Sequence, residues 1–226
     1  MVVFEKVTKI YPDSSKALDD VSFKIETGEF VSVVGHSGAG KTTLMKMILA
    51  EERPTAGLVL FEQIDIHKLR RDKIPDLRRR IGIIFQDFRL LPNKTTYENV
   101  AFAMEVAGRA DDIINADVPE VLNLVGLADK MWNFPHQLSG GEQQRAAIAR
   151  AIVNQPDVLI ADEPTGNLDP INTYDIIQIL KKVNDLGTTV LLTTHNKGVI
   201  DFLGKRVITM DKGRVVRDDP LGKYSL

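Results

Sequence analysis

The sequence predicts an α/β fold with a mixed, mainly parallel central sheet, an amino-terminal antiparallel β-subdomain and an inserted α-helical subdomain. Short β-rich runs near the amino terminus partly alternate, as in a sheet with one covered face. Later apolar runs lack alternation, which is typical of parallel strands buried on both faces. Segments with helical spacing separate these runs, as in α/β folds. The 226 residues, 43% of them hydrophobic, are enough for one domain with a sizeable insertion.

The expected strands fall into two groups. The antiparallel strands are expected at Val2–Val7, Val21–Ile25 and Leu58–Phe61. The buried parallel strands are expected at Phe30–Val34, Val158–Ala161 and Val190–Leu192. A closing hairpin is expected where Asp211-Lys212-Gly213 separates Arg206–Thr209 from Val215–Val216.

The expected helices complete one domain over residues 1–226. Apolar residues at helical spacing predict helices over Lys41–Ala50 and Thr173–Val183. Residues Thr95–Lys130 are helical in pattern and carry no strong strand signal. We therefore expect a helical subdomain, about residues 95–145, inserted into the core of a single domain.

Composition excludes several classes of function. With 29 Lys and Arg against 31 Asp and Glu, the net charge of -2 favours neither a nucleic-acid coat nor an acidic tail. The absence of cysteine excludes disulfides, thiol catalysis and cysteine-ligated metals. The amino terminus lacks a secretory signal, and no apolar run approaches the about 20 residues that cross a bilayer. We expect a cytoplasmic chain whose membrane work requires a partner.

A glycine-rich phosphate loop is the first chemical motif. It fits the pattern G-x-x-x-x-G-K-[ST] and lies between an expected strand and an expected helix. Glycines let backbone N–H groups and the helix amino end face phosphates, while Lys41 adds positive charge and Thr42 offers a hydroxyl to magnesium. An ordinary glycine turn is the alternative, and the flanking elements argue against it. The expected nucleotide-binding residues here are Gly35, His36, Ser37, Gly38, Ala39, Gly40, Lys41, Thr42 and Thr43.

Two adjacent acids, Asp162 and Glu163, directly follow the expected strand Val158–Ala161. Asp162 is placed to hold magnesium, and Glu163 to act on the attacking water as base or orienting group. Two acids that merely cap the next helix are the bland alternative. The presence of a phosphate loop in the same chain favours the catalytic interpretation.

The segment Leu138–Arg145 resembles the signature of the ATP-binding cassette (ABC) family. A helix is expected to begin at Glu142, and the serine hydroxyl and backbone N–H groups just before it can donate hydrogen bonds to a phosphate. The resemblance implies a phosphate-loop NTPase core that hydrolyses Mg-ATP in a head-to-tail homodimer, the signature of one copy completing the phosphate site of the other. A simple helix start is the alternative. The expected signature contacts are Ser139, Gly140, Gly141 and Glu142.

Weaker elements lie where the family has them. The resemblance implies that Gln86 senses magnesium and the γ-phosphate, that His195 polarises that phosphate, and that Asp169 faces the second copy. Tyr11 matches the aromatic residue that stacks on adenine. Asn196 stands where many relatives have Asp, which puts the hydrogen bonding around His195 in question.

Several segments further resemble the cell-division branch of the family, which acts with an integral membrane partner at the inner face of the membrane. Neighbouring branches include the MacB and LolD cassettes. The segments that carry the resemblance are Gly35–Lys41, Arg80–Asp87, Asn133–Leu138 and Ile152–Pro156.

Soluble ABC ATPases that act on nucleic acid or ribosomes are a different class. The sequence has a single cassette and no sustained heptads between the phosphate loop and the signature, so we expect no nucleic acid as partner. The basic stretch Lys68–Arg80 is interpreted as a solvated helix face, with a nucleic-acid patch or a contact to anionic lipid as alternatives. The apolar groups of Asp87–Pro92, expected to be exposed together, predict that a membrane partner docks a cytoplasmic helix in a groove formed by the helical subdomain and the segment Gln86–Val100.

Overall fold

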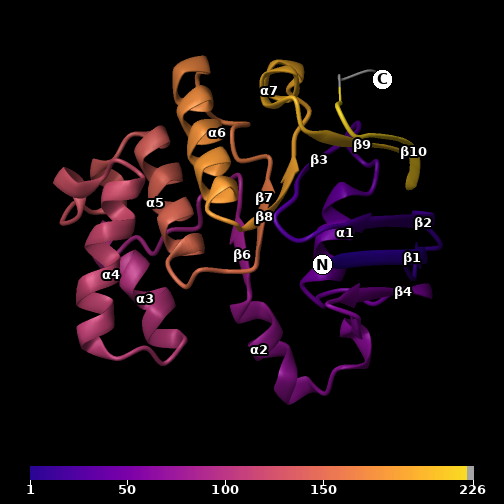
Figure 1. Ribbon diagram of the computed structural model, residues 1–226, viewed down its shortest axis with the longest axis horizontal. Coiled ribbons are helices and arrows are strands. Elements are labelled where there is room, and N and C mark those ends of the chain that lie inside the picture. The colour runs from indigo at the N-terminus through magenta and orange to yellow at the C-terminus, as the bar shows by residue number, and fades with distance from the viewer. Residues whose placement is uncertain (223–226) are drawn as a thin grey trace. The chain divides into compact units, whose positions relative to one another are not determined.

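The computed structural model describes residues 1–222 of the chain. The chain divides into two compact units. The first contains residues 1–78 together with the segment that begins at Thr189, and the second contains residues 79–188. Both units combine strands with helices (Figure 1). In residues 1–222, no helix combines the length and the apolar character needed to span a membrane.

An antiparallel sheet of order β2-β1-β4-β5 forms the amino-terminal part of the first unit (Figure 1). The first three strands confirm the predicted antiparallel group, and each is longer than expected. β1 reaches Ile10 because the turn from Tyr11 to Ser15 closes the hairpin with a 2.9 Å backbone hydrogen bond. Phe4 and Phe23 stack across the β1–β2 pair at 4.7 Å. The bounds are β1 Val2–Ile10, β2 Lys16–Ile25, β4 Ala56–Phe61 and β5 Ile64–Asp65.

The mixed sheet of the first unit has the order β10-β9-β3-β8. β3 pairs in parallel with β8 and with β9, and every residue of β3 and β8 is buried, as the lack of alternation predicted. β9 and β10 form the predicted hairpin, whose turn residues Lys212 and Gly213 have φ of 45° and 78°. The bounds are β3 Phe30–Val34, β8 Thr189–Thr193, β9 Arg206–Asp211 and β10 Arg214–Asp219.

The helices of the first unit include the predicted helix after the phosphate loop. That helix, α1, ends two residues before the predicted boundary, and Ala50 follows it with φ of 52°. The bounds are α1 Lys41–Ile48, η1 Ile66–Lys68, η2 Arg71–Lys73, α2 Ile74–Arg79 and α7 Lys197–Leu203.

The basic stretch Lys68–Arg80 runs along η1, η2 and α2. Much of its positive charge is neutralised by acids two or three residues away. These exposed ion pairs are Lys68 with Asp65 at 3.2 Å, Arg70 with Asp72 at 3.0 Å and Lys73 with Asp76 at 3.5 Å. Local pairing of this kind is typical of a solvated surface.

The second unit combines a parallel strand pair with four longer helices that stand beside one another (Figure 1). β7 extends the predicted strand by one residue, and β6 pairs with it so that Ile81 lies opposite Val158. The region expected to be helical contains α3 and α4 and no strand among its described residues. The subdomain boundaries at about 95 and 145 stay a prediction. The bounds are β6 Ile81–Ile84, β7 Val158–Asp162, α3 Thr96–Val106, α4 Asp111–Leu124, η3 Ala128–Lys130, η4 Pro135–Gln137, α5 Gly140–Ile152 and α6 Pro170–Asp185.

Candidate active site

The residues predicted from the sequence fall in both units of the chain. The first unit contains the phosphate loop, Tyr11 and His195, and the second contains Gln86, the acidic pair Asp162-Glu163 and the signature.

The phosphate loop lies between β3 and α1, as predicted. The Lys41 ammonium donates hydrogen bonds to the carbonyl oxygens of Gly35, at 2.7 Å, and His36, at 3.2 Å. The Ala39 N–H donates to the His36 carbonyl at 3.1 Å. The lysine therefore closes the loop on itself, with its charge already at the centre of the loop.

Two loop positions accept only glycine. Gly40 has φ of 104°, and a Cβ there would lie 2.6 Å from the Ala17 carbonyl oxygen. At Gly35 a Cβ would collide with the carbonyl oxygen of Met210. The backbones of β2 and β9 therefore press against the loop and fix its path.

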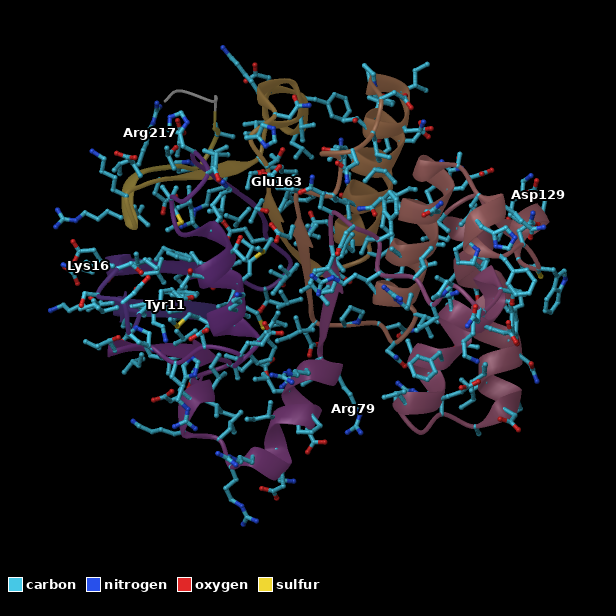
Figure 2. All side chains as sticks on the ribbon, turned by 180° about the vertical axis from the view of Figure 1, so that it is seen from behind. Tyr11, Lys16, Arg79, Asp129, Glu163 and Arg217 are labelled. Atoms are coloured by element: carbon cyan, nitrogen blue, oxygen red, sulfur yellow. The ribbon has the colours of Figure 1, made fainter. Side chains whose placement is uncertain are left out.

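Tyr11 lies beside the phosphate-loop helix, at the turn between β1 and β2 (Figure 2). Its half-buried side chain places the phenol oxygen 3.4 Å from the Thr43 hydroxyl. The Lys9 ammonium sits over its ring, 5.0 Å from the centroid. The structure thus brings Tyr11 to the first turn of α1, next to the predicted nucleotide-binding residue Thr43.

His195 is exposed in the loop after β8. The next residue, Asn196, caps α7, because its side chain accepts a hydrogen bond from the Val199 N–H at 3.3 Å. Its own N–H donates to the Thr194 hydroxyl at 3.1 Å. Asn is as good a helix cap as Asp, so the asparagine preserves the local backbone around His195.

The acidic pair lies at the carboxyl end of β7 in the second unit, and Figure 2 labels Glu163 in the loop after that strand. Asp162 ends the strand, while Glu163 adopts the left-handed conformation with φ of 46°. The Glu163 carbonyl accepts a hydrogen bond from the Gly166 N–H at 3.1 Å, which closes a tight turn. A left-handed non-glycine residue costs about 1–2 kcal/mol, so the surrounding turn holds Glu163 in an unfavourable backbone conformation.

Gln86 lies beyond β6 and contacts the loop that follows the acidic pair. Its side-chain amide donates to Asn167 Oδ1 at 3.2 Å, and Asn167 Nδ2 donates to the Gln86 carbonyl at 3.3 Å. A Cβ on Gly166 would lie 2.9 Å from the Gln86 amide nitrogen. Within the second unit, the structure brings Gln86 to the Glu163 turn.

The signature begins α5 two residues earlier than predicted. The helix starts at Gly140, not at Glu142, because Ser139 is its N-cap. The Glu142 N–H donates to the Ser139 hydroxyl at 3.3 Å, and the Ser139 N–H donates to the Glu142 carboxylate at 2.7 Å. The Ser139 N–H lowers the pKa of the Glu142 carboxyl. A Cβ on Gly141 would collide with the Asn172 side chain, which would then have to move.

Asp169 is the N-cap of α6 and accepts hydrogen bonds from the N–H groups of Ile171 and Asn172, at 2.9 and 3.0 Å. The bond from Asn172 is the main cause that lowers the pKa of the Asp169 carboxyl. Its role toward a second copy of the chain stays a prediction.

The segment after Gln86 is less exposed than expected. The prediction that its apolar groups are exposed together is wrong for Phe88, Leu90 and Leu91, which are half-buried. The Arg150 guanidinium donates to the Phe88 carbonyl at 3.0 Å and the Arg89 carbonyl at 2.6 Å.

The buried Asn99 side chain holds the next part of this segment. Asn99 exchanges hydrogen bonds with the Leu91 backbone, accepting from its N–H at 2.7 Å and donating to its carbonyl at 3.1 Å. These contacts, together with those of Arg150, hold residues 88–91 against the helices α3 and α5.

Sequence reasoning missed the polar side chains that hold these loops, namely the buried Asn99 and Gln144 and the half-buried Arg150. Glutamine and arginine on a helix usually face solvent, so residue type gives no signal. One signal was available for Gln144, because it shares the apolar face of α5 with Ile148 and Ile152 at four-residue spacing.

Comparison with known proteins gives the family. A family model described as ABC transporter matches residues 18–166. Two relatives named cell division ATP-binding protein FtsE are 52% identical to the chain. The one from Bacillus subtilis (strain 168) matches over 99% of this chain and 98% of its own length, and the one from Mycobacterium tuberculosis (strain ATCC 25618 / H37Rv) over 100% and 99%. The chain belongs to the FtsE family of ABC ATPases.

Solved structures agree with membership of the FtsE family. The ATP-binding cassette MJ0796, in a dimeric post-hydrolysis state bound to ADP and Pi, has a TM-score of 0.88 and 38% identity, covering 99% of this chain and 100% of its own. CbiO1 from Clostridium perfringens, part of the ABC transporter complex cbiONQ, has a TM-score of 0.90 and 32% identity, covering 97% and 88%. The predicted fold class and the predicted ABC ATPase activity are confirmed, and so is the resemblance to the cell-division branch.

Proposed function

We propose that this FtsE-family ATPase binds Mg-ATP, hydrolyses it between two copies of the chain, and transmits the resulting motion to an integral membrane partner of the FtsX type. In this proposal the motion regulates cell-wall hydrolysis during cell division. The observation that carries it is the 52% identity over 99–100% of the chain to proteins named cell division ATP-binding protein. The chain itself acts at the inner face of the cell membrane, held there by its partner.

The phosphate loop supplies the nucleotide site. The N–H groups of residues 35–43 and the amino end of α1 face the phosphates, while Lys41 exchanges its bonds to Gly35 and His36 for phosphate oxygens. Tyr11 stacks on adenine from its place beside Thr43. The loop needs little rearrangement because the ammonium already lies against its carbonyls.

In this proposal Thr42, Gln86 and Asp162 would hold the magnesium. Hydroxyl, amide and carboxylate oxygens are the hard donors this ion prefers. Residues 1–222 contain no cluster of three His, Cys, Asp or Glu side chains able to hold a metal. When bound, magnesium neutralises charge on the transferred phosphoryl group.

Glu163 is the general base in this mechanism. Its carboxylate takes a proton from the attacking water, and the tight turn after β7 holds it in a fixed backbone conformation. His195 polarises the γ-phosphate, and Gln86 registers whether that phosphate is present. Gln86 is suited to this because its amide is bonded to the same loop that carries Glu163.

A second copy of the chain completes the site through its signature. Ser139, Gly140, Gly141 and Glu142 form a capped helix start, where backbone N–H groups and the helix dipole favour a phosphate. The dimeric state of the related cassette MJ0796 with ADP and Pi supports this arrangement.

The membrane partner docks a cytoplasmic helix along the segment Gln86–Val100. Two features support this surface. Gln86, the proposed γ-phosphate sensor, begins the segment, and the half-buried Leu90 and Leu91 offer apolar contact within it. Because ATP shifts the chain toward the closed dimer, helices docked on this segment are carried with it.

The test of the proposed activity is ATP turnover by purified chain with and without Lys41→Ala. Removing the counter-charge is expected to weaken Mg-ATP binding and to reduce turnover on the order of a hundredfold or more. Because Lys41 also ties Gly35 and His36, the thermal stability of the variant is measured alongside. Equal turnover by the two folded proteins contradicts the proposal.

A further inference from the structure

Gln144 is a fully buried side chain in the second turn of the signature helix α5. It lies five residues after the N-cap Ser139 and is 0% exposed. A glutamine is seldom buried this completely, because its amide must then find all its partners within the protein. Its surroundings therefore reveal what the side chain is for.

Both partners of the Gln144 amide are backbone carbonyls in loops of the candidate active site. The Nε2 group donates to the Pro164 carbonyl at 2.8 Å and to the Phe85 carbonyl at 3.4 Å. Since both neighbours are acceptors, the NH₂ end must face them. The Oε1 atom is left buried with no hydrogen-bond partner among the described residues.

The two carbonyls flank the residues that act on the nucleotide. Phe85 immediately precedes Gln86, and Pro164 immediately follows Glu163. Glu163 has an unfavourable left-handed backbone conformation, with φ of 46°, so contacts from outside its turn are needed to stabilise that conformation. One buried amide thus bonds to the backbone next to both residues.

The same helix carries the signature at its amino end, where Ser139, Gly140 and Gly141 would meet the nucleotide of a second copy. We propose that Gln144 is a positioning residue, which holds Gln86 and Glu163 in register and ties both to the signature helix. This inference rests on the proposed function. Gln144 acts through the two backbone carbonyls to which its amide donates. The Oε1 atom stays without a hydrogen-bond partner in residues 1–222 because the side chain is oriented so that its NH₂ group donates both hydrogen bonds.

The chain contains a matched control for a purely structural role. Asn154 is another amide whose Nδ2 donates to a backbone carbonyl, that of Ala103, at 2.9 Å. Its Oδ1 atom is likewise buried with no hydrogen-bond partner among the described residues. The carbonyl it holds belongs to α3 and not to the loops that carry Gln86 and Glu163. Removing the Gln144 amide costs two hydrogen bonds and removing the Asn154 amide costs one, and only the first removal is expected to loosen those loops.

The experiment compares wild type, Gln144→Met and Asn154→Leu, substitutions of similar size that remove the donors. Steady-state ATP turnover gives kcat, binding of a fluorescent ATP analogue gives Kd, and thermal melting gives stability. We expect Gln144→Met to lose on the order of ten- to a hundredfold in kcat, because a displacement of a catalytic group by about 1 Å can slow the reaction by up to about a hundredfold. Its Kd is expected to stay within about twofold of wild type, since the phosphate loop is intact. Asn154→Leu is expected to keep both constants.

A kcat for Gln144→Met that matches Asn154→Leu overturns the inference. If Gln144→Met does not fold, Gln144→Asn replaces it, because the amide is kept but withdrawn by one methylene, and the same loss of kcat is expected. Wild-type kcat in folded Gln144→Asn would equally overturn it. Lys41→Ala, run in parallel, separates the two claims: if it leaves turnover unchanged, the proposed function fails, whatever Gln144 does.

Discussion

Gln86 and Asn167 exchange two hydrogen bonds, from Gln86 Nε2 to Asn167 Oδ1 at 3.2 Å and from Asn167 Nδ2 to the Gln86 carbonyl at 3.3 Å. The pair joins the segment after β6 to the turn after β7. A change in the contacts of Gln86 therefore reaches the loop that carries Glu163 directly.

Asn167→Ala is expected to lower kcat by up to about thirtyfold, because two hydrogen bonds of about 1 kcal/mol each are lost next to the catalytic turn. Steady-state ATP turnover measures the effect. The control is Asn123→Ala, a substitution of an exposed asparagine near the end of α4. Equal kcat for the two variants would show that the Gln86–Asn167 pair does not contribute to ATP turnover.

Glu163→Gln is expected to bind ATP normally and to hydrolyse it about 10²–10⁴-fold more slowly, because the amide keeps the shape of the carboxylate but cannot accept the proton. The closed dimer should then accumulate. Light scattering after size-exclusion chromatography in ATP should report twice the mass of the chain. A persistent monomer at high protein and ATP concentration would count against a site shared by two copies.

The double variant Leu90→Asp, Leu91→Asp is expected to lose association with the membrane partner while ATP affinity is retained. Charge on the apolar middle of the docking segment opposes burial of a partner helix. The matched control is Val106→Asp, Ile113→Asp, which charges two apolar residues of the same unit that are 59% and 41% exposed. If the folded Leu90–Leu91 variant co-purifies with the partner as well as this control does, the docking surface is misplaced.

His67 makes stability fall in mild acid. Burial lowers the pKa of its imidazole below the ordinary 6.5, and Nε2 is buried without a hydrogen-bond partner among residues 1–222. Because the folded pKa is the lower one, the unfolded chain takes up the proton first as pH drops. The stability contributed by neutral His67 is thus complete above pH 6.5 and is lost as pH falls toward the folded pKa.

Melting curves between about pH 7.5 and 5.5 test this, since a histidine titrates in that range. His67→Leu should flatten the pH dependence of the melting temperature. Parallel curves for wild type and His67→Leu would exclude His67 as the source.

Local patterns sufficed to predict the buried strands β3, β7 and β8 and the motifs, whereas β6 and α7 were not expected. Uninterrupted apolar runs predicted the buried strands β3, β7 and β8, and the glycine spacing predicted the turn into α1, because both depend on neighbours in the sequence. The start of α5 was predicted two residues late because the cap by Ser139 outweighs the low helix propensity of Gly140 and Gly141.

Contacts between distant segments were not predictable in the same way. Leu90 and Leu91 were expected on the surface, yet Asn99 and Arg150 hold their segment against the helices through backbone carbonyls. A hydrogen bond to a carbonyl leaves no trace in the residue type of the acceptor. The bond from Gln144 to Pro164, twenty positions away, is hidden for the same reason.

The central claim is that the signature of one copy completes the phosphate site of another, and mixing two inactive variants tests it most directly. Lys41→Ala removes the phosphate-loop charge, and Ser139→Arg blocks the signature, so each homodimer should be inactive. In a one-to-one mixture, half of the dimers are mixed and each has one intact site, so turnover should recover to about a quarter of wild type for a two-fold symmetric dimer. Turnover in the mixture no higher than in the separate variants would contradict the account.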